Sequence, residues 1–457
     1  MQKPLKEERN RMKLRDIAIG ANASIYLRMD FKKIKGVFYP RTEQEIIDAI
    51  ATAHDGGYTV TPKGGGSGLS GACTGGNRER VMISTLRMRE VLTISKDQGY
   101  ADVQPGATPD EINALLEPIG MKFWVAPSSR DIASAAGILS TDGGGNDTWV
   151  NGTMRDNTIR AKMVLHDGKR LTVDWKGVTS DDSELEAELN KKGMTISDVA
   201  SAHGTLGFIT ELRVKIKPFP SEKLIGGLAN FEDCNAMGRA LAELIKRKSP
   251  IRYGETVAAA HEDIREGLDL PLLILEFPES FASELKGILD YSELDSEGLA
   301  KMKDVRIKLP KRNPNEGLQV ALFEGYGYHG DILVKMQDAI DEINSLLMGH
   351  SLVPFARYGH APSKWYLGDN TPAYGVVLHS REIKPEDKTS REMFDTITDI
   401  VAKCNELGIT PKPEHKWPFS DETKKTRIKE LRDVMGAGFN DFILDPDGAY
   451  DTLSSLV

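Results

Sequence analysis

The chain has 457 residues, a length that suggests two or three domains and excludes a peptide-sized or disulfide-stapled module. Hydrophobic residues make up 40% of the sequence and charged residues 28%, so neither a disordered chain nor a fibrous repeat fits. The 59 Lys and Arg against 68 Asp and Glu give a net charge of −9, the wrong sign for a protein that coats phosphate backbones. We therefore expect no nucleic-acid partner.

The cysteines and the N-terminus indicate the compartment. Cys73, Cys234 and Cys404 stand far apart with no CxxC pair, which predicts neither a disulfide framework nor a thiolate metal cluster and suits a reducing environment. The charged stretch 1–15 is not followed by an apolar segment, and nowhere do about 18 apolar residues run together. We expect a cytoplasmic protein, at most peripherally associated with a membrane.

The first predicted elements alternate between strand and helix. A short apolar strand at 37–40 is followed by a helix that Thr42 caps, with apolar residues at helical spacing from Ile46 onward. A second strand at 58–62 leads directly into a run of glycines, residues 63–71. The glycine run therefore follows a strand without an intervening linker.

The next stretch continues with short elements. Strands are predicted at 81–84 and 100–104, a helix capped by Thr108 extends to Leu116, and a hairpin turns at Asp167-Gly168. Other features of this stretch are a small-residue tract at 134–145, a third glycine site at 204–207, a strand at 208–216, and Pro218 and Pro220 at a domain boundary.

Beyond residue 220 the pattern changes to longer helices between strands. Helices are predicted at 235–246, 281–291, 331–347 and 421–435, and strands at 272–277 and 318–323. This predicts a second domain of α+β type.

Consecutive glycines after a strand allow successive backbone N–H groups to point toward one anion, because no Cβ blocks the approach. The alternative is a flexible hinge, which rarely follows a buried strand directly. The run lacks the Gly-Lys-Ser/Thr ending of a nucleotide-triphosphate loop and the Gly-x-Gly-x-x-Gly spacing of a dinucleotide fold. A different phosphate ligand is expected.

The tract 134–145 carries no bulky polar side chain for twelve positions. Such a tract allows a flat aromatic ligand to lie against the backbone, and it equally suits a close contact between a helix and a sheet. Composition leaves both interpretations open.

Several motifs in order resemble a known family. They are residues 62–71, 127–129 with the tract up to 145, 152–157, 165–168 and 203–211. This order resembles the FAD-binding domain of the vanillyl-alcohol oxidase / p-cresol methylhydroxylase (PCMH) type among FAD-linked oxidases, and residues 444–448 resemble the Asp-Pro-x-Gly of its D-lactate, glycolate and D-2-hydroxyglutarate dehydrogenase branch. The resemblance implies a two-domain α+β fold with an FAD domain at 1–220, a substrate (cap) domain at 221–410 and a C-terminal segment, 411–457, returning to the FAD domain.

The resemblance also implies the residues that bind FAD. Those expected around the diphosphate are Lys63, Gly64, Gly65, Gly66, Ser67, Gly68 and Leu69. Those expected along the ribityl chain and the flavin ring are Pro127, Ser134, Ala135, Gly137, Ser140, Thr141 and Gly144. Gly207 and Ile209 are expected at the adenine half or the ring edge.

Two departures from the family pattern affect the cofactor. His203 stands where relatives usually have an acid, so a local FAD contact is expected to differ. Covalent attachment through the glycine loop needs a histidine near Ser67, and none lies between His54 and His166. We therefore predict non-covalent FAD.

The second domain carries an interrupted form of the branch's His-rich signature. Arg357, His360, Glu414 and His415 match parts of it, although the insertion 361–367 breaks the spacing. The resemblance implies that His415 accepts the hydroxyl proton, that Arg357 pairs with a substrate carboxylate, and that His360 and Glu414 hold a divalent metal. Surface or turn positions are the plain alternatives for both histidines and for the arginine.

The resulting functional hypothesis is hydride transfer from a small 2-hydroxy acid to FAD. The alternatives are an alditol or phenol oxidase, an alkylglycerone-phosphate synthase-like flavoenzyme, or a non-catalytic flavin subunit of an electron-transfer complex. The cysteines are too few to hold an iron–sulfur cluster, so an iron–sulfur or quinone electron partner would be a separate molecule. A homodimer is a further expectation.

Overall fold

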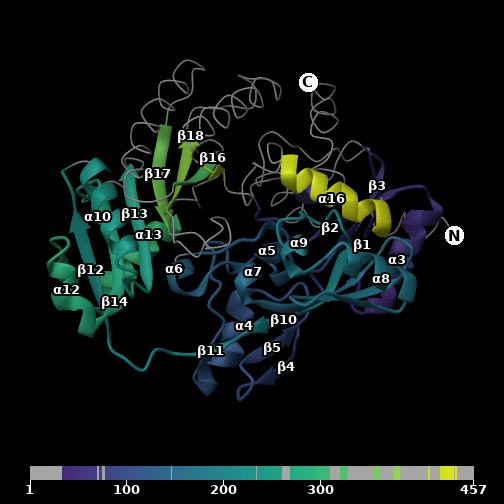
Figure 1. Cartoon of the computed structure of the whole chain (residues 1–457), viewed down its shortest axis with the longest axis horizontal. Coiled ribbons are helices and arrows are strands. Elements are labelled where there is room, and N and C mark those ends of the chain that lie inside the picture. Colours follow the sequence, from purple (N-terminus) through teal and green to yellow (C-terminus); the bar gives the residue numbers. More distant parts are fainter. Residues whose placement is uncertain are drawn as a thin grey trace.

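The computed structural model describes residues 33–68, 72–74, 78–145, 147–232, 234–259, 268–308, 320–327, 354–360, 374–380, 410–411, 422–436 and 438–439. In Figure 1 these residues form two bodies. The N-terminal body contains the elements of residues 34–218, and the second body is built on a large sheet from residue 224 onward.

A three-stranded parallel sheet opens the N-terminal body. It has the order β1-β3-β2, from β1 (Ile34–Phe38), β2 (Thr59–Lys63) and β3 (Arg80–Ser84). Helix α3 (Glu43–Asp55) begins where the Thr42 hydroxyl accepts a hydrogen bond from the Glu45 N–H, as predicted. Its apolar face packs on the sheet through residues at helical spacing, namely Ile46, Ala49, Ile50 and Ala53.

A six-stranded antiparallel sheet forms the rest of this body's framework, in the order β4-β5-β10-β7-β8-β9. Its strands are β4 (Val91–Ser95), β5 (Tyr100–Val103), β7 (Thr158–Val164), β8 (Arg170–Asp174), β9 (Val178–Ser180) and β10 (Phe208–Lys215). The predicted hairpin is confirmed between β7 and β8, and Gly168 adopts a φ of +84° in its turn.

Short helices surround this sheet. Helix α4 (Pro109–Leu116) starts with the predicted cap, in which Thr108 and Glu111 bind each other's backbone N–H groups. The remaining elements are η2 (Ala72–Thr74), η3 (Glu117–Ile119), β6 (Met121–Lys122), α5 (Ala135–Thr141), α6 (Thr148–Asn151), α7 (Met154–Asn157), α8 (Ser183–Lys191), α9 (Ile196–Val199) and β11 (Lys217–Pro218). Helix α5 packs against β10, so the small-residue tract does make a helix–sheet contact.

The second body is an eight-stranded antiparallel sheet with the order β15-β12-β14-β13-β17-β18-β16-β19. Its strands are β12 (Leu224–Asn230), β13 (Tyr253–Ala259), β14 (Leu272–Pro278), β15 (Ser292–Leu294), β16 (Val320–Gly327), β17 (Pro354–His360), β18 (Tyr374–Ser380) and β19 (Thr410–Pro411). Its helices are α10 (Cys234–Lys246), η4 (Glu279–Phe281), α12 (Ala282–Lys286) and α13 (Ser296–Lys308).

One predicted helix of the second body is shorter than expected. The predicted helix 281–291 ends at Lys286, because the chain turns at Gly287 and buries Leu289 before entering β15. The predicted helix 331–347 lies outside the described residues.

The C-terminal part of the chain lies against the N-terminal body. Helix α16 (Glu422–Met435) runs beside α9 in Figure 1 and contacts α8. Arg427 pairs with Asp198 at 2.8 Å, and Phe439 forms a parallel bridge with Val60 of β2. Phe439 is buried in the core of the three-stranded sheet.

Candidate functional site: the glycine loop and helix α5

The glycine loop, defined as residues 64–68, leaves β2 and lies directly against α5. A Cβ on Gly64 would overlap the Ser134 hydroxyl, and a Cβ on Gly65 would overlap the Ile132 carbonyl oxygen. Gly66 adopts a φ of +73°, which few side chains tolerate. The protein's own packing and backbone conformation therefore require glycine at positions 64, 65 and 66.

The backbone N–H groups of the glycine loop are the candidate donors for a ligand. No acceptor for the N–H groups of residues 64–68 is found within the described ranges. By contrast, the first donors of α5 are already used, because the Ala135 and Ala136 N–H groups bind the Ala107 and Pro105 carbonyls at 2.8 and 3.0 Å. An anion at this site would therefore be bound by the loop and not by the helix N-terminus.

One face of α5 borders the loop with small side chains. Gly137, Ser140 and Thr141 are spaced i, i+3 and i+4, so they share that face, and all three are partly exposed. A Cβ on Gly64 would be 3.7 Å from the Gly137 Cα, and one on Gly68 would be 3.9 Å from the Thr141 Cγ2. A flat ligand at the loop would meet backbone and short hydroxyl side chains.

A lysine stands at the base of the glycine loop. The Lys63 side chain is only 4% exposed, and no hydrogen bond or ion pair of its ammonium group is found within the described ranges. Nearby, burial raises the pKa of the Cys73 thiol, while the Lys63 charge opposes that rise. A buried ammonium on the residue that precedes the glycine loop favours a negatively charged ligand.

The third glycine site completes this arrangement. The turn 201–204 caps the C-terminal end of α5, because the Ser201 and His203 N–H groups bind the Leu139 and Ser140 carbonyls at 3.3 and 2.8 Å. A Cβ on Gly204 would be 3.3 Å from the Pro62 side chain, at the end of β2. The glycine loop and the turn 201–204 therefore both contact α5, which lies in the small-residue tract 134–145.

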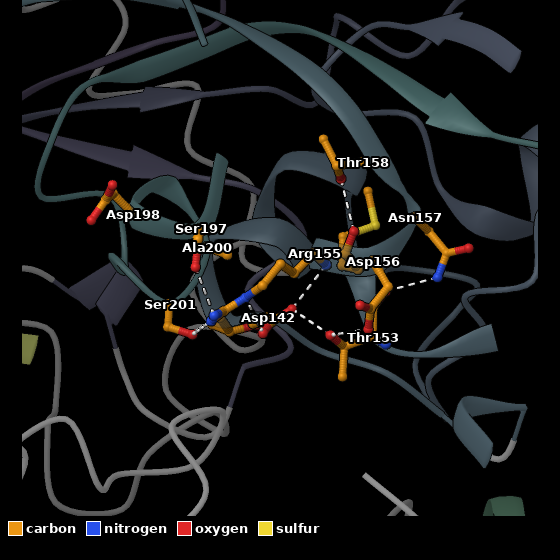
Figure 2. Close-up of polar contacts among 12 residues, drawn as sticks. Asp142, Thr153, Arg155, Asp156, Asn157, Thr158, Ser197, Asp198, Ala200 and Ser201 are labelled. Atoms are coloured by element: carbon orange, nitrogen blue, oxygen red, sulfur yellow. Dashed lines mark hydrogen bonds and ion pairs between the residues drawn. The ribbon is translucent and has the colours of Figure 1, made fainter. Parts of the chain in front are cut away.

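Sequence reasoning missed the polar cluster behind this site, which Figure 2 shows. Buried Asp142, at the C-terminal end of α5, accepts hydrogen bonds from the Thr153 hydroxyl and the Arg155 N–H at 2.7 and 2.9 Å. Arg155 also pairs with the Asp142 carboxylate at 2.9 Å. The motif 152–157 contains Arg155, but nothing in the sequence indicates that this arginine meets Asp142.

The other predicted cofactor residues lie nearby or in the core. Gly144 packs against Thr148 and Thr153, and a Cβ on Gly145 would be 3.1 Å from the Pro127 nitrogen. Gly207 and Ile209 are buried at the start of β10, where a Cβ on Gly207 would be 3.0 Å from the Met163 Cε. Leu69 lies outside the described residues.

The predicted catalytic residues belong to the second body or lie outside the described ranges. His360 is opposite Glu255 of β13 in the strand register, and Arg357 is opposite Ala259. Because strand residues alternate between faces, positions 357 and 360 lie on opposite faces of β17. Glu414 and His415 lie outside the described residues.

No metal centre is found in the described part of the chain, where no three His, Cys, Asp or Glu residues gather to hold an ion. The expected ligands His360 and Glu414 are not covered by that finding, because neither side chain is described. Likewise, no described helix is long and apolar enough to span a membrane.

Comparisons with known proteins point to the same region. Residues 34–174 match the family described as FAD binding domain. A probable mitochondrial D-lactate dehydrogenase of Danio rerio is 26% identical over 47% of this chain and 41% of its own length. A glycolate oxidase subunit of Bacillus subtilis is 27% identical over 46% of this chain and 43% of its own length.

Among solved structures, an alkyldihydroxyacetonephosphate synthase superposes with a TM-score of 0.63 at 16% identity, over 88% of this chain and 76% of that one. This likeness supports the fold alone. The chain spans less than half the length of the two curated relatives. The matched residues 34–174 resemble an FAD binding domain, and the glycine loop lies within that match.

Proposed function

We propose that this protein is an FAD-dependent oxidoreductase that oxidises the CH–OH group of a small 2-hydroxy acid, with FAD bound non-covalently. The observation that carries the cofactor part is the glycine loop, whose five N–H groups have no acceptor in the described chain and lie beside the small-residue face of α5. The similarity to D-lactate dehydrogenase and a glycolate oxidase subunit supports the substrate class.

The chain's own groups would divide the binding of FAD between them. The N–H groups of residues 64–68 bind the diphosphate, and the Lys63 ammonium adds a positive charge beside it. Gly137, Ser140 and Thr141 border the ribityl chain and the ring, where their small size lets a rigid ligand approach the backbone. When bound, FAD supplies a two-electron acceptor for the hydride of the substrate carbon.

Arg357 and His415 are the proposed substrate residues. Arg357 pairs with the carboxylate, because a guanidinium fork fits that anion, and His415 accepts the hydroxyl proton. His360 and Glu414 are the proposed ligands of a divalent metal. Since positions 357 and 360 lie on opposite faces of β17, the two cannot line one pocket from this strand. We assign Arg357 to the substrate pocket, and the metal role of His360 is the alternative use of this strand.

The proposed organisation follows the two bodies. The FAD domain is 1–220, the cap domain is 221–410, and the segment 411–457 returns to the FAD domain. The contacts of α16 and Phe439 with the N-terminal body support that return. The flavin would pass its electrons to a separate iron–sulfur or quinone partner. We further propose that the protein is located in the cytoplasm or at a membrane surface. The proposed oligomeric state is a homodimer.

The test is the visible spectrum of the purified protein. We expect a yellow protein whose FAD is released into the supernatant by acid and denaturant, and whose flavin absorbance is bleached anaerobically by D-lactate, glycolate or D-2-hydroxyglutarate. The variant Arg357→Lys should keep the flavin content and lower kcat/KM for the hydroxy acid by about tenfold or more, because an ammonium cannot form the bidentate pair.

Three results would count against this function. Flavin that stays with the precipitated chain would exclude non-covalent binding. Bleaching by an alditol, a phenol or an alkylglycerone phosphate, and by none of the hydroxy acids, would move the assignment to that substrate. A colourless, folded protein that takes up no added FAD would exclude the flavoenzyme altogether.

A further inference from the structure

Several residues with a left-handed backbone conformation lie at the C-terminal end of α5. Four non-glycine residues in the described part of the chain have positive φ, and three of them are Asp142 at +54°, Ser201 at +61° and His203 at +51°. All three are at most 2% exposed. Side chains rarely adopt this conformation, so the surrounding contacts must hold it in place.

One side chain connects these residues. The Arg155 guanidinium pairs with Asp142, and its two terminal nitrogens donate to the Ser197 and Ser201 hydroxyls at 3.0 and 3.3 Å. Figure 2 shows the side chain extending between Asp142 and Ser201. Arg155 therefore joins the C-terminal end of α5 to α9 and to the turn 201–204.

The geometry of the cluster requires an arginine. Asp142 is fully buried and Arg155 is 11% exposed, so each charge depends on the other for compensation. The three partners contact three different guanidinium nitrogens, Nε for Asp142 and the two terminal nitrogens for the serines. A lysine places its three donors on one nitrogen and cannot reach partners spread around a planar guanidinium.

The turn 201–204 contacts the proposed flavin site at two points. Through the His203 N–H it binds the Ser140 carbonyl, on the face of α5 that borders the glycine loop. Through Gly204 it packs on Pro62, two residues before the loop begins. A shift of this turn would therefore move both sides of the site together.

We infer that Arg155 is a positioning residue for the flavin site, which it sets by holding the left-handed turn 201–204 against the C-terminal end of α5. This role rests on the proposed function only in naming FAD as the ligand. The local holding of the turn is a property of the protein alone and is tested separately.

The experiment compares Arg155→Lys with Arg427→Lys. Both arginines pair with an aspartate at similar distances, 2.9 and 2.8 Å. Arg427, however, joins α16 to α9, and its hydrogen bonds and ion pairs within the described ranges are with Asp198 and Glu430. We expect R155K to raise the Kd for FAD at least about tenfold, to shift the visible spectrum of the bound flavin, and to increase amide hydrogen exchange at 139–143 and 200–206 in the apoprotein. R427K should leave all three near wild type.

A rescue variant separates positioning from a direct ligand contact. Glycine adopts the left-handed conformation readily, so Ser201→Gly in the R155K background should recover part of the lost FAD affinity. Should R155K fail to fold, Ser197→Ala, which removes one acceptor and keeps the ion pair, should give the same changes at about threefold.

Unchanged exchange at both segments in R155K, or equal changes in R427K, would overturn the inference. An unchanged Kd and spectrum in R155K would overturn it too. If the wild-type protein binds no FAD, the proposed function fails, and the apoprotein exchange data still decide whether Arg155 holds the turn.

Discussion

Gly65 and Gly68 belong to the same loop but have different neighbours. A Cβ on Gly65 would overlap the Ile132 carbonyl oxygen, whereas among described atoms a Cβ on Gly68 would meet only the Thr141 Cγ2, at 3.9 Å. Gly65 is thus required by internal packing. On that side of Gly68, where the diphosphate is proposed to bind, no other described atom lies within 4 Å.

This difference gives a substitution test of the loop. We expect Gly68→Ala to keep the thermal stability and to raise the Kd for FAD about tenfold, because the methyl group enters the ligand space. Gly65→Ala should lower both the stability and the affinity. The measurements are thermal unfolding of the apoprotein and quenching of FAD fluorescence on binding.

A matched control is Gly193→Ala, at an exposed turn with φ of +65° and no atom within 4 Å of the added methyl group. It should lower stability by about 1 kcal/mol without changing FAD affinity. Wild-type FAD binding by Gly68→Ala would show that the open side of the loop is not the diphosphate site.

At the scale of elements, the strand that carries the loop depends on the far end of the chain. The Val60 N–H of β2 donates to the Gly438 carbonyl at 2.8 Å, and the Phe439 side chain is 1% exposed beside Ile46 and Phe208. Gly436 and Gly438 pack so closely on His166 that a Cβ on either would overlap it. The C-terminal segment therefore completes the core beneath the loop.

We expect Phe439→Ala to reduce the free energy of unfolding by about 3–5 kcal/mol, the usual cost of removing a buried phenyl ring. It should also weaken FAD binding, since β2 leads into the loop. The measurement is denaturant unfolding, with Leu115→Ala at a 52% exposed site as the control. A loss no larger than that of the control would mean that this segment does not contribute to the core in solution.

The sequence predicted most elements whose signals are local. The caps at Thr42 and Thr108 and the Asp167-Gly168 turn are all present, because each depends on residues within a few positions. The predicted helix 281–291 was too long, because burial of Leu289 and pairing of β15 outweighed helical spacing. The Asp142–Arg155 pair was not predicted. The two residues are thirteen positions apart, and a contact over that distance leaves no periodic pattern in the sequence.

At the scale of the whole molecule, the two bodies meet where α6 packs on β13. A Cβ on Gly254 would be 3.1 Å from the Trp149 ring, so this strand approaches the indole closely. Asp147 stands beside this contact, and its pKa is raised from 3.8 to about 6. Burial is the main cause and Glu276 adds to it, while Lys122, Lys303 and Arg130 oppose it.

The raised pKa predicts a loss of stability with rising pH. The folded protein binds this proton more tightly than the unfolded chain, so the stabilisation is complete below pH 3.8 and is lost as the pH rises through about 6. The loss amounts to at most about 3 kcal/mol. Asp147→Asn should therefore raise the free energy of unfolding at pH 8 relative to wild type and change it little near pH 4.

Denaturant unfolding at a series of pH values measures this effect, with Asp97→Asn in an exposed turn as the matched control. If Asp147→Asn and Asp97→Asn gave the same pH profile as wild type, the raised pKa of Asp147 would be excluded. A change confined to Asp147→Asn would locate a pH-dependent contact between the two bodies.

The sequence by itself determined the order of the small-residue motifs, the helix caps and the glycines, because these depend on backbone freedom and on hydrogen bonds between near neighbours. Only the tertiary structure decided which donors remain free for a ligand. The Ala107 and Pro105 carbonyls accept hydrogen bonds from the first N–H groups of α5, whereas no described acceptor binds the N–H groups of residues 64–68. Arg155 and Phe439 contact this region from other elements. Such contacts join residues far apart in the chain, so they are fixed by the packing of the whole fold and leave no local pattern.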